Sequence, residues 1–171
     1  MQIQIQPTGN IENFIAPKRG SAHAAGLDIF AQQDITITEE TQLLDLGFKA
    51  ALICPEGTNY VAVLVPRSGS GAKFNVQLSN TLGIIDSDYR GPWKAAIHLG
   101  NKGTEGTHLE NGEMNNYLGR RDREYTFRRG EAICQMIFIE VPLADVLVSA
   151  KELPSTDRGD GGFGSTDKPR V

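Results

Sequence analysis

The sequence predicts an all-β fold, a distorted jelly-roll β-sandwich or barrel followed by a flexible, glycine-rich C-terminal arm. Short apolar segments recur along the chain with turn-forming residues between them, as in sandwiches and barrels. No segment carries the long 3.6-residue repeat of apolar positions that is typical of an amphipathic helix. The clearest turn signals are residues 7–9 (PTG), 55–57 (PEG) and 90–92 (RGP).

The expected strands follow in order from the N-terminus. Residues 2–7 (QIQIQP) and 34–40 (DITITEE) alternate apolar and polar side chains with the period of a half-buried strand. Residues 58–66 (TNYVAVLVP) form a continuous apolar, β-branched run that ends in proline, which is typical of a buried strand. Residues 93–99 (WKAAIHL) and 133–141 (ICQMIFIEV) have the same character, so we expect buried strands there as well.

Length, composition and charge indicate the class of protein and argue against several kinds of partner. A chain of 171 residues with 39% hydrophobic and 22% charged residues fits one soluble domain with a real core. The net charge of −4 gives no reason to expect stable binding to nucleic acid or membranes. The sequence shows no signal-peptide pattern and no apolar run of membrane-spanning length, and Cys54 and Cys134 stand far apart in apolar stretches. We therefore expect a cytoplasmic protein without disulfides.

The chain divides into a jelly-roll domain, residues 1–156, and a mobile arm, residues 157–171. Residues 143–153 (LADVLVSAKEL) fit either a strand or a short helix. Residues 100–126 are polar and glycine-rich and form a predicted excursion loop, which is either a tolerated insertion or the binding site of a protein partner. The arginines at its end alternate with acidic residues, which favours a salt-bridged edge over a nucleic-acid patch.

Four stretches carry polar residues that packing alone explains poorly. In residues 24–31 (AAGLDIFA), Asp28 is either a charge on the wet face of a strand or a residue that helps to hold hydrated Mg²⁺. In residues 65–73 (VPRSGSGAK), Arg67 and Ser68 stand in a glycine-containing segment that is either an ordinary β-turn or a nest for an anion.

The third and fourth stretches add a carboxylate and an amide. In residues 79–91 (SNTLGIIDSDYRG), Asp86 follows two apolar residues, so we expect it to be partly buried and to act either as a general base or as a turn cap. In residues 128–137 (RRGEAICQMI), Gln135 lies in a buried strand and needs a hydrogen-bond partner. With the aromatic face of Phe163 in the tail, these features outline a site for a nucleoside polyphosphate with Mg²⁺.

In their order and spacing, five stretches resemble the five motifs of the trimeric dUTPase family: AGLDIFA, PRSGSGAK, NTLGIIDSDYRG, RRGEAICQ and DRGDGGFGST. The resemblance spans residues 20–166 apart from the excursion loop, whose length is similar to that of some phage members. It implies a jelly-roll homotrimer with sites shared between subunits. It also implies a dUTP diphosphatase that uses Mg²⁺ and in-line water attack on the α-phosphorus to form dUMP and pyrophosphate. Such an enzyme keeps uracil out of DNA and supplies dUMP for thymidylate synthesis.

The resemblance further implies a role for each motif residue. Asp86 is the implied general base, and Asp28 touches the Mg²⁺ shell through water. Tyr89 packs beneath the deoxyribose and leaves no room for a 2′-hydroxyl, while the closing arm stacks Phe163 on uracil. The implied substrate-binding residues are Arg67, Ser68, Gly69, Asn80, Gly83, Ile84, Ile85, Tyr89, Gln135, Arg158, Phe163, Gly164, Ser165 and Thr166.

The sequence departs from the family pattern at Ser70, Ala132, Cys134 and Asp167, where the family more often has Leu, Arg, Ala and Gly. Two alternative functions stay open. One is a dCTP deaminase-like nucleotide enzyme, which shares the jelly roll and the trimer but depends on a glutamate that the Asp86 motif does not provide. The other is a nucleotide-gated regulatory protein that acts through residues 100–126.

Overall fold

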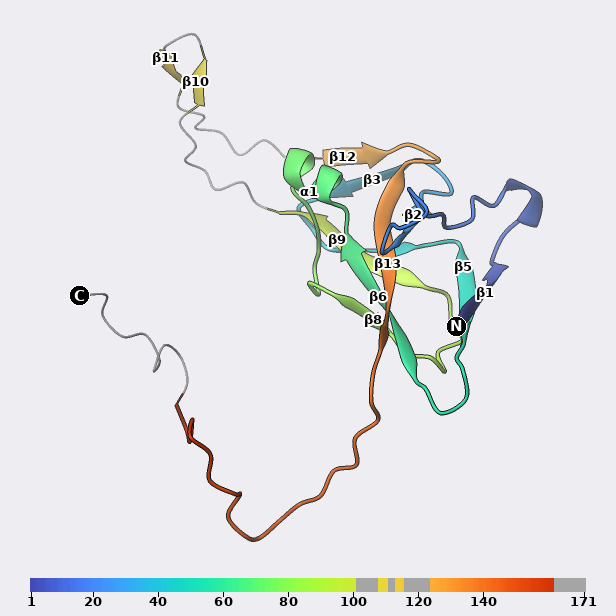
Figure 1. Ribbon diagram of the computed structural model, residues 1–171. Coiled ribbons are helices and arrows are strands. Elements are labelled where there is room, and N and C mark those ends of the chain that lie inside the picture. Colours follow the sequence, from blue (N-terminus) through green and yellow to red (C-terminus); the bar gives the residue numbers. More distant parts are fainter. Residues whose placement is uncertain (101–107, 111–112, 116–123, 162–171) are drawn as a thin grey trace.

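The computed structural model describes residues 1–100, 108–110, 113–115 and 124–161, and β-strands dominate it (Figure 1). The predicted all-β fold class is confirmed. None of the helices in these ranges is long and apolar enough to cross a membrane. In chain order the elements are β1 (Gln2–Pro7), η1 (Ile11–Asn13), β2 (Leu27–Phe30), β3 (Ile35–Thr38), β4 (Gln42–Asp45), β5 (Phe48–Ile53), β6 (Tyr60–Pro66), α1 (Ser68–Phe74), β7 (Val76–Leu78), β8 (Gly83–Ile85), β9 (Lys94–Leu99), β10 (His108–Glu110), β11 (Glu113–Asn115), β12 (Glu124–Phe127) and β13 (Ala132–Glu140).

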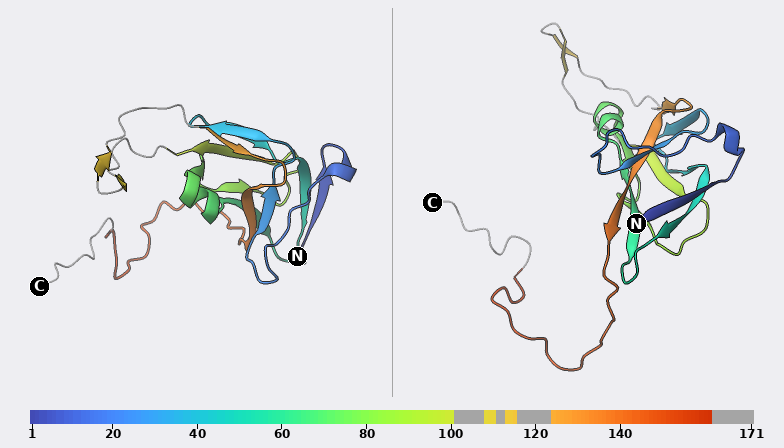
Figure 2. Two further views of the ribbon diagram at one scale, coloured as in Figure 1. Left: turned by 90° about the horizontal axis from the view of Figure 1, so that it is seen from above. Right: turned by 45° about the vertical axis from the view of Figure 1, so that its right-hand side comes forward.

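Apart from the β10–β11 hairpin, which lies away from the other strands, the strands form several small antiparallel sheets that enclose one interior (Figures 1 and 2). One sheet has the order β2-β13-β6-β8 and a second has the order β4-β9-β7. The pairs β1–β5, β3–β12 and β10–β11 complete the described strands. With nine residues, β13 is the longest of the described strands, and it lies between β2 and β6. It therefore connects segments from the beginning, the middle and the end of the chain.

The core follows from the apolar patterns in the sequence. In β5, Phe48, Ala50 and Leu52 alternate inward, and in β6 the continuous apolar run is buried from Val61 to Leu64, as predicted. Trp93 is 1% exposed, and its ring lies 5.3 Å from that of Phe48. These aromatic side chains fill the space between the sheets.

Both ends of the predicted excursion loop belong to the folded barrel. Gly100 is buried, and its N–H donates to the carbonyl of Asn75 at 2.8 Å. Residues 124–126 lie in β12, which pairs with β3, because Tyr125 and Phe127 pack against the core. The sequence did not predict this short strand, because most of the residues around it are charged or polar. Within the excursion, β10 and β11 form a hairpin, and the other residues from 101 to 123 lie outside the described part.

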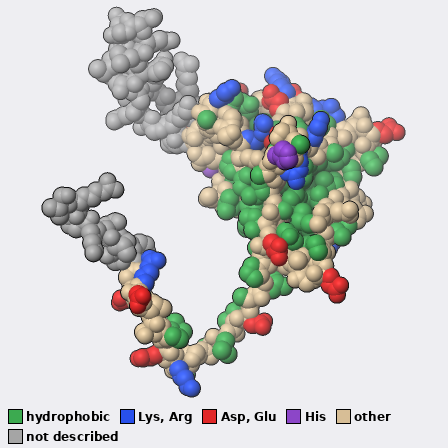
Figure 3. All heavy atoms as spheres, viewed as in Figure 1, with side chains coloured by type: hydrophobic (Ala, Val, Ile, Leu, Met, Phe, Trp, Pro, Cys, Tyr) green, Lys and Arg blue, Asp and Glu red, His purple; other side chains and the backbone are tan. Residues whose placement is uncertain are grey.

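After β13 the chain leaves the barrel. Residues 142–161 extend away from the sheets as neither strand nor helix, so neither structure considered for residues 143–153 is formed within this chain (Figures 1 and 2). Large apolar side chains along this segment are 82% to 91% exposed, and Figure 3 shows such side chains on it. They are Leu143, Val146, Leu147, Val148 and Leu153. We call residues 142–161 the extended segment.

Phe48→Ala should lower the free energy of unfolding by about 3–5 kcal/mol, because truncating a buried aromatic ring leaves a cavity. Urea denaturation followed by fluorescence measures this change. Leu43→Ala is the matched control, since Leu43 on β4 is 68% exposed, and we expect a change within about 0.5 kcal/mol. Equal losses for the two variants would contradict the assignment of Phe48 to the core.

Candidate functional site

Three of the sequence motifs meet where β2, β13 and β6 lie side by side. In the register, Gln135 of β13 is opposite Asp28 of β2 on one side and Val65 of β6 on the other. Arg67 follows β6, and its Nε lies 3.0 Å from Oδ1 of Asp28. The side-chain amide of Gln135 donates to the carbonyl of Pro66 at 3.2 Å. An acid, a cation and an amide from distant parts of the sequence thus form one polar cluster, which we call the Asp28–Arg67–Gln135 cluster.

Solvent reaches this cluster, since the side chains of Arg67 and Asp28 are 39% and 22% exposed. The loop before β2 supports it. Asp28 and Lys18 exchange two backbone hydrogen bonds of 2.8 and 3.0 Å, and the guanidinium of Arg19 donates to the carbonyls of Ala24 and Ala25. These contacts close the loop and fix the entry to β2.

Gly26 makes room for the amide in this cluster. A Cβ at this position would lie 2.8 Å from Oε1 of Gln135 and 3.2 Å from the carbonyl of Met136. Any side chain there would displace Gln135. The sequence interpretation missed this role, although a glycine two residues before the motif acid, directly before an apolar strand, was the available signal.

The glycine-containing segment after β6 forms a short helix, α1, instead of a simple turn. The N–H of Gly71 donates to the carbonyl of Arg67, and Ser68 and Gly69 form the exposed first turn. Ser70 is 8% exposed, and its hydroxyl donates to the carbonyl of Arg67 at 3.3 Å. Ser70 therefore ties the helix back to the cluster, where a leucine would offer only apolar contact.

A hollow of about 300 Å³ lies beside α1, and two of the departures from the family pattern, Ser70 and Ala132, line it. Lys73 and Glu131 contribute opposite charges, and Phe74 is among the aromatic residues of its wall. Ala132 contributes only a methyl group to this lining, at a position where the family more often carries an arginine.

The C-terminal end of α1 is held by both ends of the excursion. Asn75 takes a left-handed conformation, with φ of 58°, and its amide donates to the carbonyl of Gly100 at 2.6 Å. The rings of Phe74 and Tyr125 lie 4.5 Å apart. Because Gly100 precedes the excursion and Tyr125 follows it, both ends of the excursion contact the helix that carries Ser68 and Gly69. The sequence alone did not indicate these contacts.

The third motif lies on β8, at the edge of the four-stranded sheet. Gly83 is opposite Leu64 and has no room for a side chain, because a Cβ would lie 3.0 Å from that of Leu64. Ile84 is 55% exposed, and Asn80 lies in the exposed turn before the strand. The expectation that Asp86 is partly buried is wrong for this chain. Asp86 is exposed, because the turn that holds it projects from an edge strand with no sheet beyond it.

The turn carrying Asp86 and the Asp28–Arg67–Gln135 cluster lie near opposite ends of β6. Ile85 is paired with Ala62, so Asp86 lies level with Val61, whereas Arg67 follows the last residue of the strand. Six residues of strand span about 20 Å. One chain therefore carries two half-sites that do not meet.

The tail residues are placed only in part. Arg158 is exposed on the extended segment, and its Nε donates to the carbonyl of Gly161 at 2.9 Å. The segment that carries Arg158 leads away from the barrel in Figure 1 and in the right-hand view of Figure 2. Phe163, Gly164, Ser165 and Thr166 lie outside the described residues.

Arg128 and Arg129, which follow the excursion, both contact Asp34, and Arg128 forms an ion pair with it. The guanidinium of Arg128 lies 2.7 Å from a carboxylate oxygen of Asp34, and the N–H of Arg129 donates to the other oxygen. These donors hold the pKa of Asp34 below its ordinary value, with the backbone hydrogen bond from Arg129 as the larger cause. The acid lies far away in the sequence, so this pair does not test the predicted edge of alternating arginines and acids, of which residues 120–123 lie outside the described residues.

No three His, Cys, Asp or Glu side chains come together as a metal-binding group in the part of the chain that the structure describes. Cys134, beside Gln135, is fully buried, and this burial raises the pKa of its thiol to about 12. The thiol is therefore a neutral, apolar filler of the core and takes no part in the polar cluster.

Comparisons with known proteins agree with the motifs. The family model described as dUTPase matches residues 12–114, more than half of the chain. The deoxyuridine 5'-triphosphate nucleotidohydrolase of Yarrowia lipolytica is 39% identical over 157 residues, which cover 91% of this chain and 83% of the relative. The protein of the same name from Hydrogenobaculum sp. is 34% identical over 155 residues, with coverage of 91% and 92%.

Solved structures share the fold. A Staphylococcus bacteriophage 80alpha dUTPase variant with dUpNHpp has a TM-score of 0.72 and 22% identity over 96% of this chain and 98% of its own. A dUTPase variant from phage phi11 of S. aureus, described as coordinating a structural Mg(II) ion, has a TM-score of 0.66 and 22% identity, with coverage of 88% and 98%.

Cys134 should resist alkylation by iodoacetamide in the native protein, because its thiol is buried and stays protonated far above neutral pH. Cys54, which is partly exposed, should react first, as measured by peptide mass spectrometry after labelling at pH 8. In urea both cysteines should react. Native labelling of Cys134 at the rate of Cys54 would contradict its burial.

Proposed function

The chain belongs to the dUTPase family, and from this premise we infer how its own residues act on the nucleotide. It is a dUTP diphosphatase, which hydrolyses dUTP to dUMP and pyrophosphate. The resemblance read from the five motifs is confirmed. The deaminase-like and regulatory alternatives are not favoured by these relatives, and a protein partner at residues 100–126 stays a prediction.

The observation that carries the mechanism is the separation of the two half-sites along β6. Asp86 cannot act on a phosphate held by Arg67 of the same chain across about 20 Å of strand. A complete site therefore combines the β8 turn of one subunit with the Asp28–Arg67–Gln135 cluster of another. This division supports the homotrimer with shared sites.

The uracil is read by the edge of β8. An edge strand presents main-chain N–H and C=O groups that no neighbouring strand takes, and β8 is paired with β6 only on its other side. The backbone of Gly83, Ile84 and Ile85 pairs with the base there, and Asn80 adds its side-chain amide. Tyr89, 45% exposed in the following turn, supports the deoxyribose.

The phosphate chain lies against the opposite half-site. Ser68 and Gly69 in the first turn of α1, together with Gln135, contact the phosphates, and Arg67 adds charge. Mg²⁺, when bound, neutralises the phosphate oxygens and fixes their conformation. Asp28 fits a contact to the ion through water, because its carboxylate is partly exposed and sits beside this turn.

Asp86 orients the water that attacks the α-phosphorus and takes its proton. In a single chain this carboxylate is exposed, so the neighbouring subunit and the closed arm supply the exclusion of water that the reaction needs. Residues 157–171 close over the nucleotide, with Phe163 on uracil and Arg158, Gly164, Ser165 and Thr166 at the phosphates. Ordering such an arm costs on the order of 1 kcal/mol per residue, which contacts to a full triphosphate can offset.

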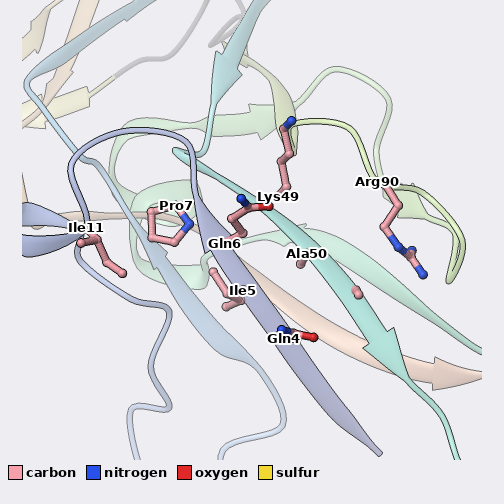
Figure 4. Close-up of a pocket in the computed structure, with 9 residues that line it drawn as sticks. Gln4, Ile5, Gln6, Pro7, Ile11, Lys49, Ala50 and Arg90 are labelled. Atoms are coloured by element: carbon pink, nitrogen blue, oxygen red, sulfur yellow. The ribbon is translucent and has the colours of Figure 1, made fainter.

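The extended segment supports assembly. Its exposed apolar side chains have nothing to cover within their own chain, and isolated apolar runs of this kind are typical of interfaces. A hollow of about 490 Å³ beside β1 offers a surface for a neighbour's segment (Figure 4). Lys49 and Arg90 at this hollow complement Asp145 and Glu152 of the segment. We place the resulting enzyme in the cytoplasm, in keeping with its free cysteines.

Asp86→Asn should lower kcat for dUTP by about 10²–10⁴-fold and leave dUTP binding intact, because only the proton acceptor is lost. Pyrophosphate release with Mg²⁺ measures the rate. Asp88→Asn is the matched control, since Asp88 is an exposed carboxylate in the same turn, and it should keep most of the activity. The reverse pattern would refute the assignment of the base, and ammonia release from dCTP would refute the diphosphatase mechanism.

Val146→Asp combined with Val148→Asp should convert the trimer to monomers and abolish dUTP turnover, because two charges would enter the apolar contact between subunits. Size-exclusion chromatography with light scattering reports the assembly state. Ser155→Asp adds a charge to an exposed polar position of the same segment and should leave the trimer intact. A variant that stays trimeric, or an active monomer, would contradict the shared site.

A further inference from the structure

The turn between β8 and β9 is tied down on several sides. The hydroxyl of Ser87 donates to the side-chain oxygen of Asn59 at 2.9 Å. The guanidinium of Arg90 donates to the carbonyls of Ser87 and Tyr89 at 2.7 and 3.1 Å. The N–H of Tyr89 donates to the carbonyl of Asp86 at 3.2 Å. The backbone that carries Tyr89 therefore has little freedom to move.

The chain just after the turn is equally constrained. Trp93 is 1% exposed, and its backbone N–H donates to the carbonyl of Phe48 at 2.9 Å. Pro92 fixes its own φ and restricts the residue before it. Gly91 is thus held between an immobile turn and a buried anchor.

The ring of Tyr89 lies directly against Gly91. A Cβ on Gly91 would be 2.3 Å from the Tyr89 hydroxyl oxygen and 2.6 Å from Cζ. No such contact exists in real structures, so one partner would have to move. The backbone at Gly91 cannot yield, whereas the Tyr89 side chain is 45% exposed and has solvent to swing into.

Backbone conformation does not explain this glycine. The glycines with positive φ in the described residues are Gly47, Gly57, Gly130 and Gly159, and Gly91 is not among them. The φ of Gly91 therefore lies outside the left-handed region that favours glycine, and what an alanine would lack here is space for its Cβ. The hydroxyl of Tyr89 donates to the carbonyl of Pro92 at 3.3 Å, a long and weak hydrogen bond. The space above Gly91 is therefore the main determinant of where the ring lies.

We propose that Gly91 is a positioning residue for sugar specificity: its missing side chain lets the Tyr89 ring lie against the backbone at Gly91, where it excludes a 2′-hydroxyl. This inference rests on the proposed role of Tyr89 beneath the deoxyribose. A methyl group at position 91 tilts the ring outward and removes the fixed surface that distinguishes deoxyribose from ribose. Gly91 touches no part of the nucleotide and acts only through Tyr89.

The test compares kcat/KM for dUTP and for UTP in the full-length protein with Mg²⁺. Gly91→Ala should lower the dUTP-to-UTP ratio by at least about tenfold, since discrimination comes from contacts made in the transition state. Gly20→Ala is the matched control, because a Cβ at Gly20 meets nothing within 4 Å and its φ is not positive. It should keep the wild-type ratio. A folded Gly91→Ala protein with the wild-type ratio overturns the inference.

A double variant separates the ring from the backbone. If Gly91 acts through the ring, adding Gly91→Ala to Tyr89→Ala should leave the ratio of Tyr89→Ala unchanged, even where the single Gly91 variant folds poorly. A further tenfold loss, or a double variant that also fails to fold while Tyr89→Ala folds, overturns the inference. A wild-type ratio in Tyr89→Ala overturns the proposed role of Tyr89 itself, and the inference with it. If Tyr89→Ala lowers the dUTP-to-UTP ratio of kcat/KM and Gly91→Ala does not, the inference about Gly91 is overturned and the proposed role of Tyr89 stands.

Discussion

The pairing of β13 with β2 on one side and β6 on the other sets the position of the polar cluster. Cys134 and Met136 are fully buried on one face of β13, and Gln135 between them points to the other face. A slip of one residue would exchange these faces and drive the amide into the core. The core therefore fixes the register, and the register places Gln135 level with Asp28 and next to Arg67.

The strand pairing that brings Asp28, Arg67 and Gln135 together keeps the motif that carries Asp86 apart from them. Because β8 pairs antiparallel with the middle of β6, its turn points toward the end of the sheet opposite Arg67. A rigid strand cannot fold back on itself, so no rearrangement of one barrel brings Asp86 to the cluster. In the proposed mechanism, assembly is therefore a condition of the chemistry, and we infer that the exposed apolar side chains after β13 contribute to it.

Two glycines serve the site through the space they leave. Gly26 leaves room for the Gln135 amide, and Gly91 leaves room for the Tyr89 ring. Neither has the positive φ that usually explains a glycine in a turn. Positive φ angles near the site occur at Gly130 in the fourth motif and at two residues other than glycine, Asn75 after α1 and Thr81 before β8. Gly26 and Gly91 therefore serve to place the side chains of Gln135 and Tyr89, and turn geometry is not their main role.

Strand β5, which buries Phe48, Ala50 and Leu52, was not among the strands expected from the sequence. The all-β class, the strands β1, β3, β6, β9 and β13 and the identities of the motif residues could be predicted from it. These follow from alternation, turn residues and short motifs, which are local properties of the chain. Tertiary structure decided what depends on strand pairing: the exposure of Asp86 on an edge strand, the inclusion of residues 124–127 in a sheet, and the separation of the half-sites. No local pattern states which strand is an edge or how far apart two motifs lie, because both depend on contacts between residues distant in sequence.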